Sequence, residues 1–348
     1  MMKIYINGRF LTQRLTGVQK FAYQYTNELF VQYKDNLIVL IPQKSKINNF
    51  YKKKFNVKHI GSNSGHLWEQ FDLPIYLRRI NNPLLISFTN SNPCFYKNKI
   101  TTIHDLSIYV NINWYSIYYR FFYKIILPLI INNSLKVITV SNFSKNEILD
   151  KFSINKDKIM VLYNCVIPSS QKKYNNDKEK YLLFIGSNND RKNLKNLLLA
   201  FLELKNLNLN LKLVGININD LPMEYRSINR IECLGYVNNE KLDSYYVNAF
   251  ALISPSLYEG FGIPLIEAMR NKCPLLVSDI NVYKEVCGNA AIYFNPYDIN
   301  DIKNNIEYLY NSQDLIPELI NLGQEQLKNF NIKHQVKKLI KNIQICDD

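Results

Sequence analysis

The sequence predicts an α/β protein of two domains, each built on a mostly parallel sheet with helices on both faces. With 348 residues the chain is long enough for two domains of ordinary size, each with its own core. Short apolar runs alternate with helix-like segments in both halves, which is typical of doubly wound, Rossmann-like sheets. Between the halves, residues 168–180 are mostly polar and lack hydrophobic periodicity. We therefore predict a first domain at 1–167, a linker at 168–180 and a second domain at 181–331.

The first domain combines apolar runs of strand length with longer segments of helical periodicity. We predict its strands at Lys3–Asn7, Leu37–Ile41, Val57–Gly61, Leu84–Thr89, Ile100–His104, Lys136–Ser141 and Lys158–Leu162. Helices are predicted at Val18–Tyr33, His66–Arg79, Tyr115–Asn133 and Asn142–Phe152.

The second domain repeats this alternation and then becomes almost entirely helical. Its strands are predicted at Tyr181–Gly186, Leu211–Val214, Arg230–Leu234, Ala251–Ser254, Pro274–Val277 and Ala291–Phe294. Helical periodicity dominates from Asp301 onward and includes the last stretch, Ile332–Ile345.

The composition limits the classes of function. Apolar residues make up 47% and charged residues 21% of the chain, which excludes wholesale disorder. The net charge of +14 attracts nucleic acid, anionic membranes or phosphorylated substrates. The basic residues are scattered and form no nucleic-acid-binding module, so we expect no nucleic-acid partner. The chain start lacks the apolar core of a signal peptide, and the longest apolar run, Ile125–Ile131, is far below the ~20 residues that span a bilayer. A cytoplasmic location is expected.

The stretch Ser254–Met269 carries the strongest functional signal. It reads as a strand end, a loop and a helix start, with Pro264 in the first helical turn, where its missing N–H costs nothing. Gly260 and Gly262 leave the N–H groups of the loop open to a ligand, and the positive end of the helix dipole favours a diphosphate. Carboxylates such as Glu259 accept hydrogen bonds from the vicinal hydroxyls of sugars. The stretch therefore suits a nucleotide sugar.

Glu259 and Glu267, with Gly-Phe-Gly-x-Pro between them, resemble the signature of retaining glycosyltransferases of family 4. That family has the GT-B fold, in which two Rossmann-like domains face each other across a cleft. The resemblance implies that domain 1–167 binds the acceptor, that domain 181–331 binds the nucleotide sugar, and that helix 332–348 packs back on the first domain. It also implies that the reaction needs no cofactor.

The resemblance assigns roles within this signature. Glu259 is expected to be catalytic, contacting the sugar hydroxyls and orienting the anomeric carbon, while Glu267 accepts hydrogen bonds from the ribose. Gly260, Phe261 and Gly262 are expected to line the donor site.

Two other segments of the second domain also resemble donor-binding loops of the family. Arg191 and Lys192 follow a strand and Gly186, where their charges would neutralise the leaving diphosphate without a metal. The family often has an Arg where this chain has Ser187, so only the later basic pair is available. Main-chain groups at Val237 are expected to contact the nucleobase.

In the first domain, Gly17 resembles a donor-contacting glycine at the first helix, although a simple helix start capped by Thr16 remains an alternative. His104 lies at the end of a predicted strand, where doubly wound sheets bind ligands. The Ile-His-Asp-Leu run around it resembles polysaccharide mannosyl- and rhamnosyltransferases, which implies that His104 touches the transferred sugar. Asp105 is expected to orient His104.

Together these features predict a retaining hexosyltransferase of surface polysaccharide biosynthesis, such as that of O-antigen and lipopolysaccharide. The His104 resemblance favours GDP-mannose as donor, with dTDP-rhamnose and UDP-sugars as alternatives. The expected acceptor is an oligosaccharide or a lipid-linked saccharide. The aromatic segment 114–128, with Arg120 and Lys124, suits either peripheral contact with an anionic membrane or a buried helix. Remote alternatives are a sugar-nucleotide epimerase, a phosphorylase and a basic nucleic-acid-binding protein.

Overall fold

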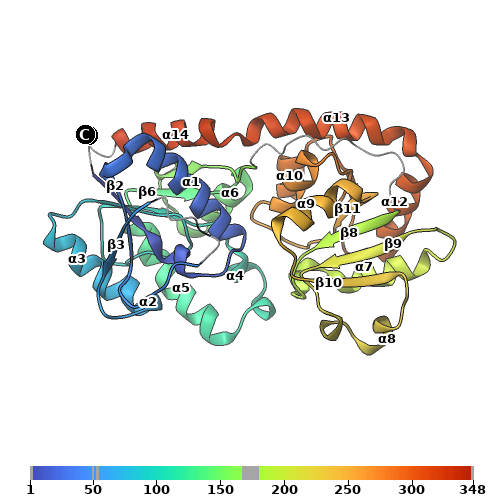
Figure 1. Ribbon diagram of the computed structural model, residues 1–348, viewed down its shortest axis with the longest axis horizontal. Coiled ribbons are helices and arrows are strands. Elements are labelled where there is room, and N and C mark those ends of the chain that lie inside the picture. The colour runs from blue at the N-terminus through green and yellow to red at the C-terminus, as the bar shows by residue number, and fades with distance from the viewer. Residues whose placement is uncertain (1–2, 49–50, 52–54, 167–179, 346–348) are drawn as a thin grey trace. The chain divides into compact units, whose positions relative to one another are not determined.

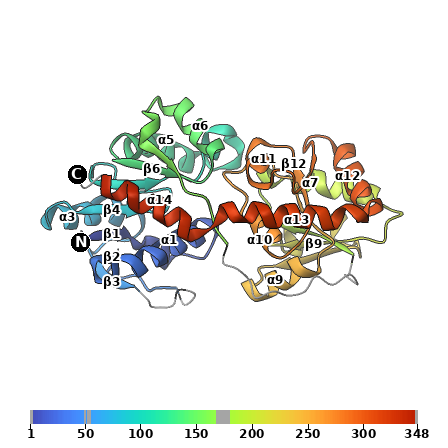
Figure 2. The same ribbon diagram turned by 90° about the horizontal axis from the view of Figure 1, so that it is seen from above.

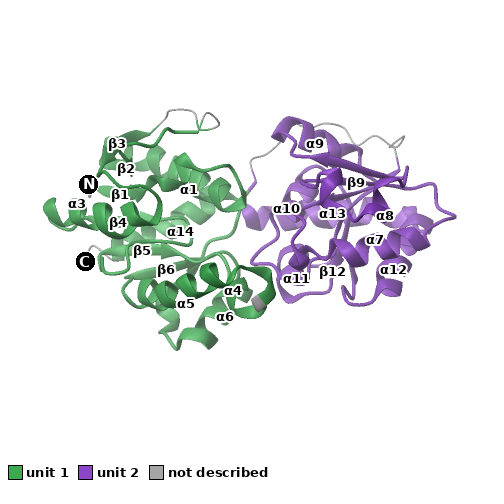
Figure 3. Cartoon of the chain, turned by 90° about the horizontal axis from the view of Figure 1, so that it is seen from below, with its two compact units in different colours: residues 1–165, 331–348 green, residues 166–330 purple. Residues whose placement is uncertain are grey.

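The computed structural model describes residues 3–48, 51, 55–166 and 180–345. The expected linker, 168–180, lies outside these residues except for its last position. The chain divides into two compact units (Figure 3). Unit 1 comprises Met1–Cys165 and Asn331–Asp348, and unit 2 comprises Val166–Phe330. No helix of the described chain is both long and apolar enough to cross a membrane.

Unit 1 contains a seven-stranded parallel sheet in the order β3-β2-β1-β4-β5-β6-β7. Buried β-branched and leucine side chains dominate its central strands, as expected for a sheet covered on both faces. Ile6 of β1 lies opposite Val39 of β2 and Ile86 of β4, which fixes the register at the centre. The strands are β1 (Ile4–Asn7), β2 (Leu37–Pro42), β3 (Asn56–Ile60), β4 (Leu84–Ser87), β5 (Lys99–Thr102), β6 (Lys136–Thr139) and β7 (Ile159–Val161).

The helices of unit 1 are α1 (Gly17–Tyr33), α2 (Gly65–Leu67), α3 (Leu73–Arg79), α4 (Ser107–Val110), α5 (Ile117–Asn132), α6 (Asn142–Phe152) and α14 (Ile332–Ile345). The helix predicted at His66–Arg79 consists of three consecutive parts, because a π-helical turn at Trp68–Asp72 separates α2 from α3.

The C-terminal helix α14 lies beside α1 in both views (Figures 1 and 2). Its Val336, Leu339 and Ile343 recur on one face and are buried. Gln335 accepts a hydrogen bond from the Tyr163 N–H at 3.3 Å, and Lys338 Nζ donates to the Val161 carbonyl at 2.8 Å. These contacts hold the end of the chain on unit 1.

Unit 2 contains a six-stranded parallel sheet in the order β10-β9-β8-β11-β12-β13. Its strands are β8 (Tyr181–Ile185), β9 (Asn210–Val214), β10 (Ile231–Gly235), β11 (Ala251–Ser254), β12 (Leu275–Ser278) and β13 (Ile292–Phe294). Its helices are α7 (Leu194–Glu203), α8 (Met223–Arg226), α9 (Asn239–Asn248), α10 (Ile263–Arg270), α11 (Asn281–Cys287), α12 (Ile299–Asn311) and α13 (Ile316–Gln326). Leucines of α7 and Ile302, Ile306 and Leu309 of α12 pack in one core with the strands.

Each sheet has one place where the strand order reverses. In unit 1 this switch point lies between β1 and β4, and in unit 2 it lies between β8 and β11. Loops leaving two such strands diverge to opposite sides of the sheet, which opens a crevice at the carboxyl ends of the strands. Ligands of doubly wound sheets bind there, so both switch points are candidate sites.

Candidate functional site

The switch point of unit 2 is formed by the loops that follow β8 and β11. The first loop ends in a turn of 3₁₀-helix at Asp190–Lys192, and the second carries Glu259. The Leu257 N–H donates to the Arg191 carbonyl at 2.8 Å, which ties the two loops together. Two segments that are distant in the sequence therefore form one surface.

A charged cluster occupies this surface. Arg191 Nη1 donates to Glu259 Oε2 at 2.7 Å, and Lys192 Nζ donates to Glu259 Oε1 at 2.5 Å. The Ser256 hydroxyl donates to the same Oε1 at 3.0 Å, and Arg191 Nη1 also donates to the Tyr258 carbonyl at 2.9 Å. All three charged residues were predicted site residues, and the structure brings them into direct contact.

The electrostatics of the cluster favour an anionic ligand. Burial alone raises the pKa of the Glu259 carboxyl, but the charges and hydrogen bonds of Lys192 and Arg191 outweigh burial and lower the pKa to about 2. Glu259 is therefore ionised at neutral pH. Two cations around one carboxylate leave a net charge of +1 in a largely buried cluster. Burial lowers the local dielectric, which strengthens the attraction between this net charge and a phosphate group.

Helix α10 begins at Ile263, after the loop that carries Glu259, and contributes to the same surface. Gly262 caps it with φ +104°, a conformation that side chains disfavour. A Cβ at Gly262 would lie 2.9 Å from atoms of both Leu265 and Tyr283, so the position has no room for a side chain. Pro264 lies in the first turn, which has no acidic residue to offset the helix dipole.

The remaining residues of the signature have different surroundings. Glu267 is half-buried on α10, and its Oε2 accepts a hydrogen bond from the Tyr246 hydroxyl at 3.0 Å. Phe261 is buried and packs edge-on against Phe330, with ring centroids 5.5 Å apart. The side chain of Phe261 therefore anchors the loop in the core of unit 2. The sequence could not show whether the Phe261 side chain faces the core or the proposed donor site.

Gly186 and Val237 lie at the carboxyl edge of the same sheet. The Gly186 N–H donates to the Val214 carbonyl at 3.0 Å and continues the β8–β9 pairing. A Cβ at Gly215 would lie only 2.4 Å from the Gly186 carbonyl oxygen, so the main chains approach closely here. Val237 is half-buried and follows β10, the edge strand, two strands away from β8.

In unit 1, Gly17 is the first residue of α1. Thr16 occupies the N-cap position, but its hydroxyl donates to the Gln19 side chain and makes no cap hydrogen bond to the helix backbone. Thr16 is therefore the N-cap residue, as the alternative expected, but it caps the helix through its main-chain carbonyl, which accepts from the Lys20 N–H at 2.9 Å.

His104 follows β5 and is 6% exposed. Its Nε2 hydrogen-bonds to the Phe88 carbonyl at 3.0 Å. Its ring packs edge-on against the Phe21 ring, with the ring centroids 5.0 Å apart. Burial lowers the pKa of His104, although the Phe88 carbonyl and the Asp105 charge oppose that effect. A neutral His104 that donates through Nε2 has Nδ1 as its acceptor.

The prediction that Asp105 orients His104 is wrong. Asp105 Oδ1 accepts hydrogen bonds from the Ser107 N–H at 2.9 Å and the Ser107 hydroxyl at 2.5 Å. It therefore stabilises the start of α4, while the Phe88 carbonyl orients the imidazole. Adjacent residues at a strand end point in different directions, which explains why sequence proximity was misleading here.

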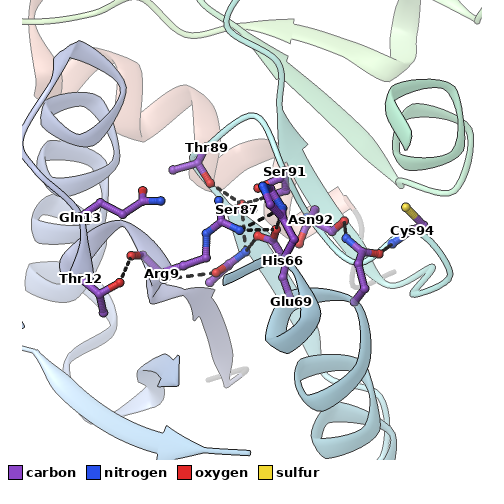
Figure 4. Close-up of polar contacts among 12 residues, drawn as sticks. Arg9, Thr12, Gln13, His66, Glu69, Ser87, Thr89, Ser91, Asn92 and Cys94 are labelled. Carbon is purple, nitrogen blue, oxygen red and sulfur yellow. Dashed lines mark hydrogen bonds and ion pairs between the residues drawn. The ribbon is translucent and has the colours of Figure 1, made fainter. Parts of the chain in front are cut away.

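A second polar cluster, which the sequence analysis did not single out, lies at the switch point of unit 1. It consists of Asn7, Arg9, His66 and Glu69. Figure 4 shows Arg9, His66 and Glu69 side by side. The position of Asn7 at the end of the first strand and of Arg9 in the turn that follows was a usable signal. Glu69 gave none, because it resembles any solvated glutamate of an amphipathic helix.

Comparisons with known proteins agree with this architecture. Residues 63–170 match the family described as Glycosyltransferase Family 4, and residues 167–326 match Glycosyl transferases group 1. The O-antigen chain mannosyltransferase RfbU of Salmonella typhimurium is 30% identical over 271 residues, which cover 73% of this chain and 74% of that protein. The O-antigen chain mannosyltransferase B of Escherichia coli is 30% identical over 227 residues, or 60% of each chain.

Solved structures of low sequence identity share the fold. Sucrose-phosphate synthase from Thermosynechococcus elongatus aligns with a TM-score of 0.77 and 16% identity, covering 99% of this chain and 98% of that one. WaaG, a glycosyltransferase involved in lipopolysaccharide biosynthesis, aligns with a TM-score of 0.75 and 12% identity, covering 97% and 98%. The predicted GT-B fold is confirmed.

Proposed function

Because the chain belongs to glycosyltransferase family 4 and is a glycosyltransferase, we propose that it transfers mannose from GDP-mannose to a polysaccharide hydroxyl. The proposed reaction retains the anomeric configuration and requires no metal. Relatives named as O-antigen mannosyltransferases support the choice of sugar and of pathway. The charged cluster of Arg191, Lys192 and Glu259 at the switch point of unit 2 is the observation that carries the proposal.

The cluster suits the departure of a diphosphate. As the bond between the sugar and the phosphate breaks, negative charge grows on the phosphate oxygen, and the fixed charges of Arg191 and Lys192 stabilise it. Both are held in place by Glu259, so little reorganisation is needed when the charge appears. Gly186, Gly260 and Gly262, together with Gly17 of unit 1, are proposed to allow close approach of the donor.

Glu259 has a second role in this proposal. Its two carboxylate oxygens offer about four acceptor positions, of which the hydrogen bonds from Arg191, Lys192 and Ser256 use three. The remaining position is proposed to accept a hydroxyl of the transferred sugar. Glu267 is proposed to bind the ribose, exchanging or sharing its hydrogen bond with Tyr246.

The remaining donor contacts follow the same reasoning. The main chain at Val237 and Phe261 is proposed to complete the donor site, and neutral His104 is proposed to accept a sugar hydroxyl through Nδ1. In the transfer step, the acceptor oxygen bonds to the anomeric carbon on the face that the diphosphate leaves. A departing phosphate oxygen takes the hydroxyl proton, so the chain needs no separate base.

We further propose that unit 1 binds a lipid-linked acceptor and touches an anionic membrane at the cytoplasmic face. Helix α5 buries Tyr123, Leu127 and Ile130 in the core. Its other face exposes Ile117, Tyr118 and Phe121 at 70%, 86% and 70%. One face of the helix is therefore buried, and the exposed face is the part that we propose contacts the membrane. An exposed aromatic face flanked by Arg120 and Lys124 suits the interfacial region of an anionic membrane.

A donor and acceptor screen tests the proposed function. Purified protein is incubated with GDP-mannose, dTDP-rhamnose or UDP-glucose, each with and without a panel of octyl glycosides. The proposal predicts acceptor-dependent consumption of GDP-mannose and an α-linked product. Transfer from dTDP-rhamnose or UDP-glucose alone would replace the donor assignment. Conversion of a nucleotide sugar without acceptor would instead support an epimerase.

A further inference from the structure

The switch point of unit 1 holds a buried carboxylate that the proposed reaction does not use. Asn7 is the last residue of β1 and Ser87 is the last residue of β4, so both lie where the strand order reverses. Arg9 follows in the next turn, and Glu69 comes from the helix beyond β3. Four segments thus converge where doubly wound sheets bind ligands (Figure 4).

Glu69 is fully buried and bonded on both oxygens. Asn7 Nδ2 donates to Oε1 at 2.6 Å, Arg9 Nη1 donates to Oε2 at 3.1 Å, and His66 Nδ1 lies 3.3 Å from Oε2. Burial raises its pKa, but His66, Arg9, Asn7 and Ser91 outweigh burial and lower it, so Glu69 is an anion. Arg9 Nη1 also lies 3.0 Å from His66 Nδ1.

Fold stability alone does not account for this cluster. Burying an ion pair carries a desolvation cost that often equals or exceeds the attraction of the charges. Glu69 also lies in the π-helical turn Trp68–Asp72, where an extra residue per turn redirects the side chains. Such turns are frequently found at functional sites. A buried carboxylate that holds two less buried side chains is better explained as support for a binding site.

Two side chains of the cluster remain accessible. The His66 side chain is 38% exposed and the Arg9 side chain 12%. The His66 ring also lies 4.9 Å from the Phe122 ring, which limits its orientation. The charges of Arg9 and Glu69 cancel, so this site favours neutral hydroxyls, whereas the unit 2 cluster with its net charge of +1 favours phosphate.

We propose that Arg9 and His66, positioned by Glu69, bind hydroxyl groups of the acceptor sugar. The inference rests on the proposed function, since it names the acceptor-binding residues of that reaction. In this arrangement Glu69 is a positioning residue beneath the site. Arg9 and His66 contact the sugar.

The test measures sugar binding and transfer separately. Saturation-transfer NMR is recorded with the methyl glycosides of mannose, glucose, galactose and N-acetylglucosamine, which lack an alkyl chain that could bind the apolar face of α5. At least one glycoside is expected to bind the wild-type protein. His66→Ala should weaken that binding about tenfold, as expected for one lost hydrogen bond. Glu69→Gln should weaken it as well, because the amide no longer holds both partners.

A matched control is His59→Ala, which removes another histidine of unit 1 that is exposed on β3, outside the cluster. It should bind the glycoside like the wild type. In transfer assays, His66→Ala should raise the acceptor KM about tenfold while the donor KM stays near the wild-type value. Thermal unfolding shows whether the Glu69→Gln protein is folded. If it is not, the test rests on His66→Ala, because His66 is more exposed and its replacement disturbs the core less.

The outcomes separate this inference from the proposed function. Glycoside binding that is unchanged in both variants would overturn the inference, as would the absence of binding to any of the four glycosides by the wild type. A wild type that binds a glycoside through His66 but consumes no nucleotide sugar would overturn the proposed function and leave a sugar-binding site. Wild-type transfer with an unchanged acceptor KM in His66→Ala would overturn the inference alone.

Discussion

Replacing Glu259 with Gln separates the two roles that the structure gives to this carboxylate. The amide keeps the volume of the side chain but removes the charge that faces Arg191 and Lys192. The net charge of the cluster rises from +1 to +2, so GDP should bind at least as tightly as to the wild type. Transfer should fall by about a hundredfold or more, because the hydrogen bonds that orient the sugar weaken.

The same variant has a calculable effect on stability. The pKa of Glu259 lies at about 2 against an ordinary value of 4.5. At about 1.4 kcal/mol per pH unit, this difference corresponds to roughly 3 kcal/mol of folding free energy at neutral pH. Because the folded pKa is lowered, this stabilisation is complete above about pH 5 and is lost as the pH falls toward 2. The stability difference between wild type and variant should shrink over that interval.

Urea unfolding across this pH range and calorimetry with GDP test both statements. The matched control is Glu232→Gln, because Glu232 faces Lys212 at 3.5 Å but its side chain is 56% exposed. An ion pair with a carboxylate this exposed contributes little, so the control should match the wild type in stability and transfer. Wild-type transfer by Glu259→Gln, or a loss of GDP binding that parallels the loss of transfer, would refute the reasoning.

Two further changes test the surface and the loop. Changing Tyr118 and Phe121 to Ser should weaken binding to phosphatidylglycerol vesicles at least about tenfold in sedimentation assays. The reason is that two large apolar side chains are no longer transferred from water into the membrane. Val31→Ser on α1, 57% exposed, should leave vesicle binding unchanged, and equal losses in both proteins would contradict the α5 assignment. Gly262→Ala should destabilise the protein by roughly 1–3 kcal/mol in denaturant titrations, from its positive φ and its contacts with Leu265 and Tyr283. Gly65→Ala has a positive φ but open space, so an equal or larger cost there would contradict the packing argument.

Much of the fold was predictable because it follows from local patterns. The strand preceding Glu259 was predicted at Ala251–Ser254 and lies there, because a short apolar run bounded by loop residues specifies a buried strand. Residues after parallel strands meet at one edge, so placing Arg191 and Glu259 in the same region required only the strand order.

The details of the sites depend on tertiary contacts that the sequence does not encode locally. Glu259 was expected to contact a sugar. In the structure its carboxylate accepts hydrogen bonds from Arg191 and Lys192, which lie far away in the sequence. Asp105 was expected to bind its neighbour His104, but the side chains of adjacent residues diverge. The π-helical turn that carries Glu69 inward interrupts a segment whose pattern reads as regular helix.

The most direct test of the account is calorimetric titration of GDP and UDP into the variant with Arg191→Ala and Lys192→Ala. The control carries Lys205→Ala and Lys241→Ala, two exposed lysines of unit 2, and loses the same charge away from the cluster. The account predicts that the wild type and the control bind GDP with similar affinity and that the cluster variant binds at least about tenfold more weakly. Wild-type affinity for GDP in the cluster variant would contradict the claim that this switch point holds the diphosphate.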